Sequence, residues 1–564
     1  MLSSSIEEKI RLVSTMKDNN ITYSNMEEEN DNDIQSRSSS ISITHNNNNN
    51  NNNNSIGGTK IGTWMLVGLI FFSVSGGPVG MEVAVKAGGP FLALLGFLVM
   101  PLVWSVPEAA MTAELSIAYP EAAGFAAWTN AAYGPFLSFQ CSMMSYFSGV
   151  LDNAVYPVLL IQYMTQNDAL RDISDEVRWF SILGFTVIMT YSTWRGLDVN
   201  GMTCILLTIF ILIPFVLFIF IGIPQIHISN WFLGPMKRDE NNHIIDDDEI
   251  RDSHNGNYYH DVKWHSLINI LFWNLNYFDS ASAFSGDCIE PEKTFPKAMF
   301  ISVFFIALTY FIPLLVATGA EPNASYCDGC FVDIASKVAG PWLGYWITIA
   351  AAFSCIGQFM AEMASDSFQI MGMADEGQLP KFLSTRSKYG TPTIAILVSA
   401  TGVALASPLD FTAIVELVNI LYIFAELIEF ASFIKLRNTA TQPRIWKIPI
   451  ENPYGLILFF LPASCFLLLV LVLSSFLGAM VASCALVFNI LLYFLICVAR
   501  NQNLCQFEKI PEDWSVHRDP EWVQLVVKYL SSFFTKREQH RFGTVPTENE
   551  PSEVTATNSP LHDQ

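Results

Sequence analysis

Charged side chains are scarce in this chain of 564 residues, and that scarcity excludes most protein classes. They make up 15% of the sequence, against about 25% in ordinary soluble domains. Hydrophobic residues make up 51%, and they include 42 Phe and 13 Trp. One soluble core cannot bury so large an apolar fraction. The composition therefore excludes a soluble enzyme, a fibrous protein and a nucleic-acid-binding protein, and it predicts a polytopic membrane protein embedded in the lipid bilayer.

Motifs of the common enzyme classes are also missing. The sequence contains neither the H-E-x-x-H motif nor the G-x-S-x-G motif, and the glycines at 76–80 do not follow the phosphate-loop pattern. We therefore expect no enzyme, no catalytic residue and no cofactor. Cys327 and Cys330 form a C-x-x-C pair, but a zinc site would need two further ligands. We expect no metal there, and either a small disulfide or two free thiols.

Twelve apolar segments follow a polar stretch at the amino terminus. Segment 1–60 ends in a run of asparagines and is expected to be a disordered cytoplasmic tail. An acidic loop, 223–263, and a second cytoplasmic tail, 500–564, are expected further on. The fold class predicted is all-α with 12 transmembrane helices. The expected spans lie near 61–85, 89–118, 134–165, 178–195, 199–222, 264–288, 297–319, 341–372, 392–407, 410–434, 453–476 and 478–499.

The basic residues give this array an orientation, because cytoplasmic loops are enriched in Lys and Arg. If the amino terminus is cytoplasmic, most basic residues of the short loops fall on the cytoplasmic side, among them Lys60, Arg195 and Arg437. An even number of spans then places both termini in the cytoplasm. The glycosylation sequon that begins at Asn323 falls on the outer side, in agreement with this orientation.

Two of the spans are interrupted in the middle. Segment 75–80 of the first span holds three glycines and a proline, and segment 274–286 of the sixth span holds a polar cluster. Interrupted helices at matching positions of two halves are typical of inverted-repeat secondary transporters, in which the substrate binds at the breaks. A packing kink in one span and an ordinary polar helix face in the other are the alternative interpretation.

Acidic residues lie within the spans, whereas we find no Lys or Arg in the span interiors. A buried carboxylate must be paired, protonated or facing water. Since no internal base is expected as a partner, these acids must be neutral or compensated by a cation from outside, which is typical of a proton-coupled cation carrier. The acids are Glu82, Glu108, Glu114, Asp152, Asp279, Asp287, Glu362, Asp366, Glu416, Glu426 and Glu429.

Several long strings make the sequence similar to a known family. They include Ser75-Gly76-Gly77-Pro78, Trp104-Ser105-Val106-Pro107-Glu108-Ala109, Leu151-Asp152-Asn153-Ala154-Val155-Tyr156-Pro157, Asn274-Leu275-Asn276-Tyr277 and Ala361-Glu362-Met363-Ala364-Ser365-Asp366. In these strings the chain resembles the plant polyamine uptake transporters of the amino acid–polyamine–organocation (APC) superfamily. The resemblance runs from residue 61 to 450 and more loosely to 500. One departure is Ser73, where the plant relatives tend to carry Glu.

The resemblance implies a LeuT-like fold with two inverted five-helix repeats and two further helices. The first repeat would be 61–222 and the inverted repeat 264–434, while 435–499 would hold helices 11 and 12 with the preceding loop. It also implies proton-coupled uptake of polyamines such as putrescine or spermidine. The plasma membrane is the expected location, with an internal membrane as the alternative.

The site residues follow from the breaks, the acids and this resemblance. Asp152 and Asp279 are expected to bind the ammonium groups of the substrate, and Tyr156 and Tyr277 could stack on them. The full set expected to bind substrate is Gly76, Gly77, Pro78, Asp152, Tyr156, Asn276, Tyr277 and Asp279. The set expected to carry the coupling proton is Glu82, Glu108, Glu362 and Asp366. The rival functions are a proton-coupled amino acid permease of the same fold and a nutrient sensor that does not transport.

Overall fold

The computed structural model describes residues 61–119, 124–165, 174–195, 197–233, 262–439, 445–508 and 519–541. The expectations for the tail 1–60, for 234–261 of the acidic loop, and for 509–518 and 542–564 of the second tail fall outside these residues. The regular elements of the described part are helices, and its β-structure consists of two isolated bridges, Ile61 with Cys288 and Arg386 with Pro392.

The helices before the acidic loop correspond to the first five predicted spans. The first span is divided between α3 and the start of α4, where Gly89 has a positive φ of 77° that separates it from the second span. The second continues through a short π-helix. These elements are α3 (Thr63–Val74), α4 (Glu82–Met100), η2 (Pro101–Ser105), α5 (Val106–Ala118), α6 (Phe125–Tyr133), α7 (Pro135–Thr165), α8 (Asp175–Trp194), α9 (Leu197–Gly222), η4 (Ile223–Gln225) and η5 (Ile228–Phe232).

The helices after the loop correspond to the remaining seven predicted spans. The sixth span is divided between α10 and the 3-10 helix η7. The elements are α10 (Trp264–Trp273), η7 (Asp279–Asp287), α11 (Pro291–Ala320), α12 (Phe331–Ala339), α13 (Pro341–Asp375), η8 (Lys381–Ser384), α14 (Thr393–Ala406), α15 (Phe411–Thr439), α16 (Pro453–Leu473), α17 (Phe476–Asn501) and α18 (Glu521–Arg541).

Length and apolar composition make this a multi-pass membrane protein. Eight helices of the described part are long and apolar enough to cross a bilayer, and α3 and α14 are shorter apolar helices. Three helices, α6, α12 and α18, were not predicted from the sequence. They are short or strongly polar, so they lack the long apolar run that revealed the others.

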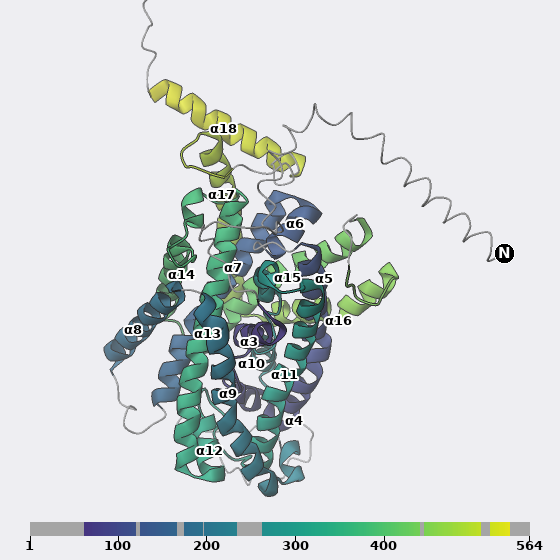
Figure 1. Cartoon of the computed structure of the whole chain (residues 1–564), viewed down its shortest axis with the longest axis vertical. Coiled ribbons are helices and arrows are strands. Elements are labelled where there is room, and N and C mark those ends of the chain that lie inside the picture. Colours follow the sequence, from purple (N-terminus) through teal and green to yellow (C-terminus); the bar gives the residue numbers. More distant parts are fainter. Residues whose placement is uncertain are drawn as a thin grey trace, which may run out of the picture. The chain divides into compact units, whose positions relative to one another are not determined.

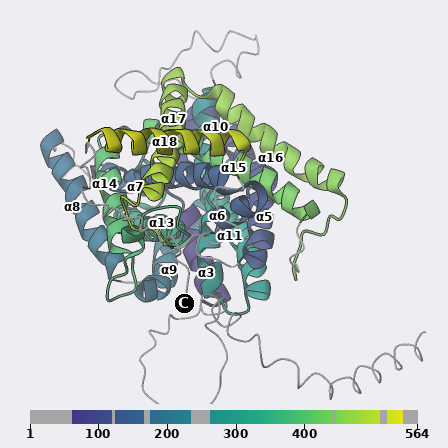
Figure 2. The same cartoon turned by 90° about the horizontal axis from the view of Figure 1, so that it is seen from above.

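The helices pack around α7 and α13. Helix α7 lies along α15 and α13, while α3 packs against α9, α11 and α13 (Figure 1). Seen from above, α8 and α16 lie at opposite edges of the bundle (Figure 2). The two halves of the sequence therefore interleave, because α3 and α7 from before the acidic loop contact α11, α13 and α15 from after it.

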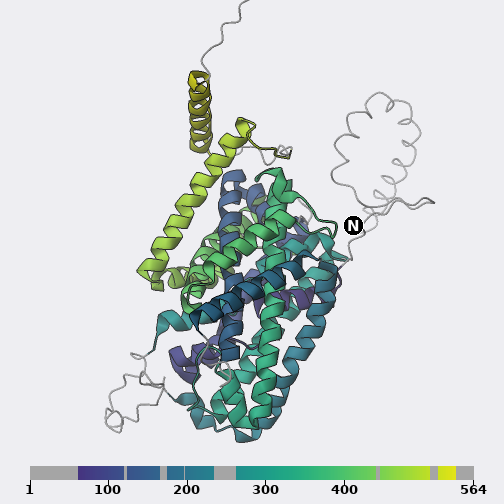
Figure 3. The same cartoon turned by 90° about the vertical axis from the view of Figure 1, so that its left-hand side faces the viewer.

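The carboxyl-terminal segment is anchored to the bundle. Helix α18 packs against α17, which Figure 3 shows from the side in the colours of the carboxyl end of the chain. The buried Asp519 accepts hydrogen bonds from the Phe136 N–H at 2.7 Å and from the Tyr493 hydroxyl at 2.5 Å. Phe136 lies in the first turn of α7, whose N–H groups have no acceptor within the helix. Asp519 thus supplies an acceptor for the end of α7 from a distant part of the chain.

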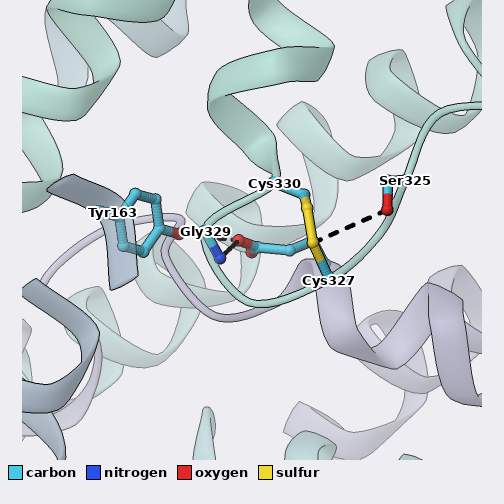
Figure 4. Close-up of a disulfide and its surroundings, with 6 residues drawn as sticks. Tyr163, Ser325, Cys327, Gly329 and Cys330 are labelled. Carbon is cyan, nitrogen blue, oxygen red and sulfur yellow. Dashed lines mark hydrogen bonds between the residues drawn. A yellow bond between two sulfur atoms is a disulfide. The ribbon is translucent and has the colours of Figure 1, made fainter. Parts of the chain in front are cut away.

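A disulfide shapes the loop between α11 and α12. Cys327 and Cys330 are bonded, so the disulfide is the form found of the two alternatives (Figure 4). The Gly329 N–H inside this loop donates to Glu82 Oε1 at 3.0 Å. The same oxygen accepts from the Tyr163 hydroxyl at 2.8 Å. Glu82, expected to carry the coupling proton, therefore fastens the disulfide loop to the first residue of α4.

One acid pairs with a base, and for it the expectation of no internal basic partner is wrong. Arg437 donates from Nη1 to Glu114 Oε2; the Glu114 side chain is fully buried and that of Arg437 nearly so. Arg437 Nη2 also donates to the carbonyl oxygens of Ile448 at 2.8 Å and Ile450 at 3.0 Å. The expectation failed because it placed Arg437 in a loop, whereas α15 continues to Thr439 and carries Arg437 in its last turn.

Asp328, in the disulfide loop, predicts a pH dependence of stability. Burial raises the pKa of Asp328 from its ordinary value of 3.8 to about 6, and Lys86 opposes this rise. Between pH 3.8 and about 6 the folded protein therefore holds this proton more tightly than the unfolded chain, so stability falls as pH rises through that window. The wild type should exceed Asp328→Asn in melting temperature by more at pH 5 than at pH 7. An unchanged difference would contradict the pKa shift.

The Arg437–Glu114 pair predicts a large loss of stability when one partner is removed. Arg437→Met leaves the Glu114 carboxylate buried without its cation, which costs about 3–5 kcal/mol. We expect a lower melting temperature of the purified protein in detergent. The double variant Arg437→Met with Glu114→Gln removes both charges and should recover most of the loss. Equal melting temperatures for the single and double variants would show that the charge pairing contributes little.

Candidate functional site

A small closed cavity lies between the broken helices and their neighbours. A water-sized sphere has about 10 Å³ in which to move there, so the cavity holds about one water molecule. It contains no Lys or Arg among its lining residues. These residues are Ser73, Val74, Asp152, Tyr156, Trp273, Asn274, Tyr277, Tyr310 and Gln358.

Asp152 is the acidic group of this cavity. Its Oδ1 accepts a hydrogen bond from Trp273 Nε1 at 2.6 Å, and its Oδ2 accepts one from the Tyr156 hydroxyl. Tyr156 lies one turn further along α7, and Trp273 is the last residue of α10. The carboxylate is thus oriented by two donors that belong to aromatic walls of the cavity, and both oxygens remain buried.

The first break is held by polar groups of α11 and α13. The Ser75 carbonyl accepts from Gln358 Nε2 at 3.1 Å and from the Tyr310 hydroxyl at 3.3 Å, and the Gly76 carbonyl accepts from the Ser354 hydroxyl at 2.8 Å. Gly76 has a φ of 61°, and a Cβ there would overlap the Gln358 side chain. Glycine is therefore required by both the backbone conformation and the close approach of α13.

Two further expected site residues, Gly77 and Pro78, lie in the first break. Gly77 has a φ of 126°, and its N–H donates to the Ser75 hydroxyl at 3.2 Å. Pro78 follows directly and has no N–H to offer. The break therefore presents few free backbone donors, although Gly76, Gly77 and Pro78 lie beside the cavity residue Val74 in the chain.

The second break runs through Tyr277, which has a φ of 72°. Such a conformation is rare for a bulky residue and marks stored strain. Its hydroxyl is hydrogen-bonded to the Ser148 hydroxyl on α7, and its ring lies 4.4 Å from that of Tyr422 on α15. The side chain of Asn276 is fully buried, and no described residue forms a hydrogen bond with its amide. Tyr277 therefore joins the cavity wall to α15.

Glu108 satisfies the backbone of this second break. Its Oε1 accepts from the Phe278 N–H at 2.6 Å and from the Asp279 N–H at 3.2 Å. The Tyr422 hydroxyl contacts the same oxygen at 2.8 Å and Asp279 Oδ1 at 2.5 Å. A carboxylate from α5 thus receives the backbone donors that begin η7. Asp279 faces Glu108 and Tyr422 and is not among the residues that line the cavity.

Glu362 and Asp366 lie one turn apart on the buried face of α13. They face Gly149 of α7, where a Cβ would overlap Asp366 and lie 3.0 Å from Glu362 Oε1. Glycine at 149 therefore lets α7 approach both carboxylates. Glu362 is also close enough to Asp152 and Asp279 to interact with them electrostatically. Asp152 and the pair on α13 thus form one buried acidic region between α7 and α13.

The structure distributes the expected acids and tyrosines over four places, one of which is the pair Glu362 and Asp366 on α13. Asp152, Tyr156 and Tyr277 line the cavity, Asp279 and Glu108 lie together behind the second break, and Glu82 lies at the disulfide loop. Sequence reasoning missed Tyr310, Gln358 and Tyr422. Gln358 lies one turn before Glu362 on the same helix, which was an available signal, whereas Tyr310 and Tyr422 carry no motif that could have indicated them.

Comparison with known proteins gives a consistent result. The profile of the amino acid permease family matches residues 61–500. A probable polyamine transporter of Arabidopsis thaliana is 40% identical over 79% of this chain and 89% of its own length. The polyamine transporter PUT1 of Oryza sativa subsp. japonica is 40% identical over 76% of each chain, and the polyamine transporter RMV1 of Arabidopsis thaliana is 39% identical over 77% of this chain and 84% of its own length. The resemblance seen in the sequence is thereby confirmed, and the chain belongs to the amino acid permease family.

Proposed function

We propose that this protein is a proton-coupled symporter that imports polyamines. The observation that carries the proposal is the carboxylate of Asp152, which is buried in a cavity lined by four aromatic side chains and by no basic residue. A buried carboxylate is costly unless a cation pairs with it. An ammonium group of the substrate supplies that cation, and the aromatic rings of Tyr156, Trp273 and Tyr310 add cation–π attraction.

The comparisons support the same substrate class. Relatives that are about 40% identical over three quarters or more of this chain are named as polyamine transporters. Ser73, at which the chain departs from the expected Glu of the plant proteins, lines the cavity. We therefore propose Asp152 as the first ligand of a substrate ammonium group, and Ser73 as a position that adjusts the preference among polyamines.

The proposed topology completes this assignment. We propose 12 membrane spans, with 61–222 and 264–434 as inverted repeats, 435–499 as the last two helices and both termini in the cytoplasm. The protein would act in the plasma membrane. The closed cavity is too small for a polyamine, which needs more space than a single water molecule. Substrate entry would therefore require the cavity to widen.

An amino acid permease is the rival that the geometry makes less favourable. A substrate carboxylate would need free backbone N–H groups at the breaks. The Gly77 N–H donates to Ser75, and those of Phe278 and Asp279 donate to Glu108. These donors are occupied, and Pro78 has none. A sensor would bind the substrate as the proposed symporter does but would not carry it across the membrane. The two are distinguished by measuring spermidine flux.

The proposal predicts uptake driven by a pH gradient. Proteoliposomes with an acidic exterior should accumulate labelled spermidine, and a protonophore should abolish the accumulation. A one-unit gradient supports about a tenfold accumulation when one proton accompanies each substrate. Membrane potential is held at zero with potassium and valinomycin, and sodium is replaced by choline in a parallel sample. Uptake that requires sodium and ignores the pH gradient would contradict proton coupling, and binding without flux would favour the sensor.

The cavity predicts a specific effect of Asp152→Asn. The substitution keeps the size of the side chain but removes its charge, and a hydrogen bond to a charged group contributes about 1.5–3 kcal/mol. Affinity for spermidine should therefore fall roughly ten- to a hundredfold, as measured by competition with labelled spermidine. Asp410→Asn, an exposed change between α14 and α15, is the matched control and should bind as the wild type does. Unchanged affinity of well-folded Asp152→Asn would remove Asp152 from the binding site.

A further inference from the structure

Three buried carboxylates gather around one tyrosine hydroxyl behind the second break. The Tyr422 oxygen lies 2.8 Å from Glu108 Oε1, 2.5 Å from Asp279 Oδ1 and 2.9 Å from Glu426 Oε1. The three acids come from α5, η7 and α15, and each is almost completely buried. Their oxygens lie within 4.8 Å of one another. We call this group the Tyr422 cluster.

We infer that the Tyr422 cluster, formed by Glu108, Asp279 and Glu426, holds the coupling proton, and that Glu108 transmits the protonation state to the break between α10 and η7. The inference rests on the proposed symport and deepens it. It differs from an assignment of the proton to Glu362 and Asp366, which lie on α13 outside this cluster.

Counting hydrogens shows that the cluster needs a proton. A tyrosine hydroxyl has one hydrogen to donate and two lone pairs that accept. The Tyr277 N–H donates to Tyr422 at 3.3 Å and occupies one lone pair. The hydroxyl hydrogen can be given to one carboxylate, and the other contacts would then join two oxygens with no hydrogen between them. The remaining lone pair of Tyr422 can accept from one carboxyl group, so at least one of the three carboxyl groups must carry a proton for a second of the three contacts to be a hydrogen bond.

A second observation points in the same direction. Glu108 Oε2 and Glu426 Oε2 are buried and accept no hydrogen bond from any residue that the structure describes. Glu429, one turn beyond Glu426, is fully buried as well, and its Oε2 has no such partner within the described residues. Glu429 interacts electrostatically with Asp279 and Glu108. Buried acceptors without donors are costly, and a proton on the cluster lowers that cost.

The surrounding charged and titratable groups do not neutralise the cluster. From α7, the Cys141 thiol faces Glu429 at 3.7 Å. From α13, Glu362 lies within electrostatic range of Asp279. Arg437 lies on the same helix as Glu426, but its guanidinium donates to Glu114 and to two carbonyl groups. Protons from solution are therefore the cations that fit this group.

A proton fits the geometry better than a metal ion does. The centre of the three carboxylates is occupied by the Tyr422 oxygen, and the separations of 2.5–2.9 Å are hydrogen-bond lengths between oxygens. Calcium or magnesium would lie 2.0–2.6 Å from its oxygen ligands and would need that central position. Glu108 Oε1 is also engaged by two backbone N–H groups.

The link to the substrate cavity runs through Glu108. Its ionised carboxylate accepts strong, charge-assisted hydrogen bonds from the Phe278 and Asp279 N–H groups. Protonation weakens those bonds and frees the start of η7. Tyr277, the residue before Phe278, lines the cavity and is held in a strained conformation. Uptake of one proton on one side and its release on the other, with an O–H bond formed and then broken, can thus move the cavity wall.

Glu426→Gln tests the inference. Glu426 is the member of the Tyr422 cluster that contacts neither the cavity nor the backbone of the break. Two assays in proteoliposomes separate its roles. One measures accumulation of labelled spermidine driven by a pH gradient, and the other measures exchange of labelled for unlabelled spermidine at equal pH on both sides. We expect gradient-driven accumulation to fall about tenfold or more while exchange stays within about twofold of wild type. Asp410→Asn, an exposed change directly before the same helix, is the control and should behave as wild type in both assays.

The remaining outcomes are decisive as well. The inference would be overturned if Glu426→Gln accumulated spermidine as strongly as the wild type does. It would also be overturned if a folded Glu426→Gln lost accumulation and exchange to the same extent. Loss of wild-type accumulation with a chelator and its recovery with calcium or magnesium would overturn it too, because they would identify a metal site. If Glu426→Gln does not fold, Glu426→Leu, which removes the titratable group and leaves no buried amide, replaces it with the same expectation. If the wild-type protein accumulates no spermidine, the proposed function itself is wrong. If Glu426→Gln still accumulates spermidine in response to the pH gradient, only the assignment of the proton to the Tyr422 cluster is wrong.

Discussion

An interrupted helix within a bilayer must find partners for the backbone groups that its break exposes, because lipid offers none. The rest of this structure follows from how that requirement is met at two breaks. The first is satisfied by neutral groups, the hydroxyls of Ser354 and Tyr310 and the amide of Gln358. The second is satisfied by the carboxylate of Glu108. The two breaks are therefore chemically different, although they occupy matching positions in the sequence.

This difference makes the two breaks respond differently to pH. A break held by neutral groups has hydrogen bonds that do not depend on pH, which suits the fixed wall of the proposed substrate cavity. A break held by a carboxylate has hydrogen bonds whose strength changes with protonation. Tyr277 connects the second break to the cavity on one side and to Tyr422 on the other. Under the proposed function, substrate binding and proton coupling would be adjacent without sharing the same acid.

Much of the fold could be predicted from the sequence, because long apolar runs are dictated by the thickness of the bilayer. The long helices between α3 and α17 lie at the predicted spans, α6 and α12 excepted, and both breaks were visible as Gly-Pro and polar interruptions. Which acid faces which neighbour could not be predicted. The Asp279 side chain contacts Tyr422 of α15, and its backbone N–H donates to Glu108; neither neighbour follows from the local sequence. The partners of Arg437 depended on where α15 ends, which apolar periodicity does not define.

The anchoring of the carboxyl-terminal segment limits where the chain can be shortened or fused to another protein. Asp519 supplies an acceptor to the first turn of α7, the helix that also carries Asp152. A chain shortened before residue 519, or a fusion partner that pulls this segment away, would leave a buried N–H group of α7 without its acceptor. Asp519 therefore links the carboxyl-terminal segment directly to the helix whose Asp152 and Tyr156 line the cavity.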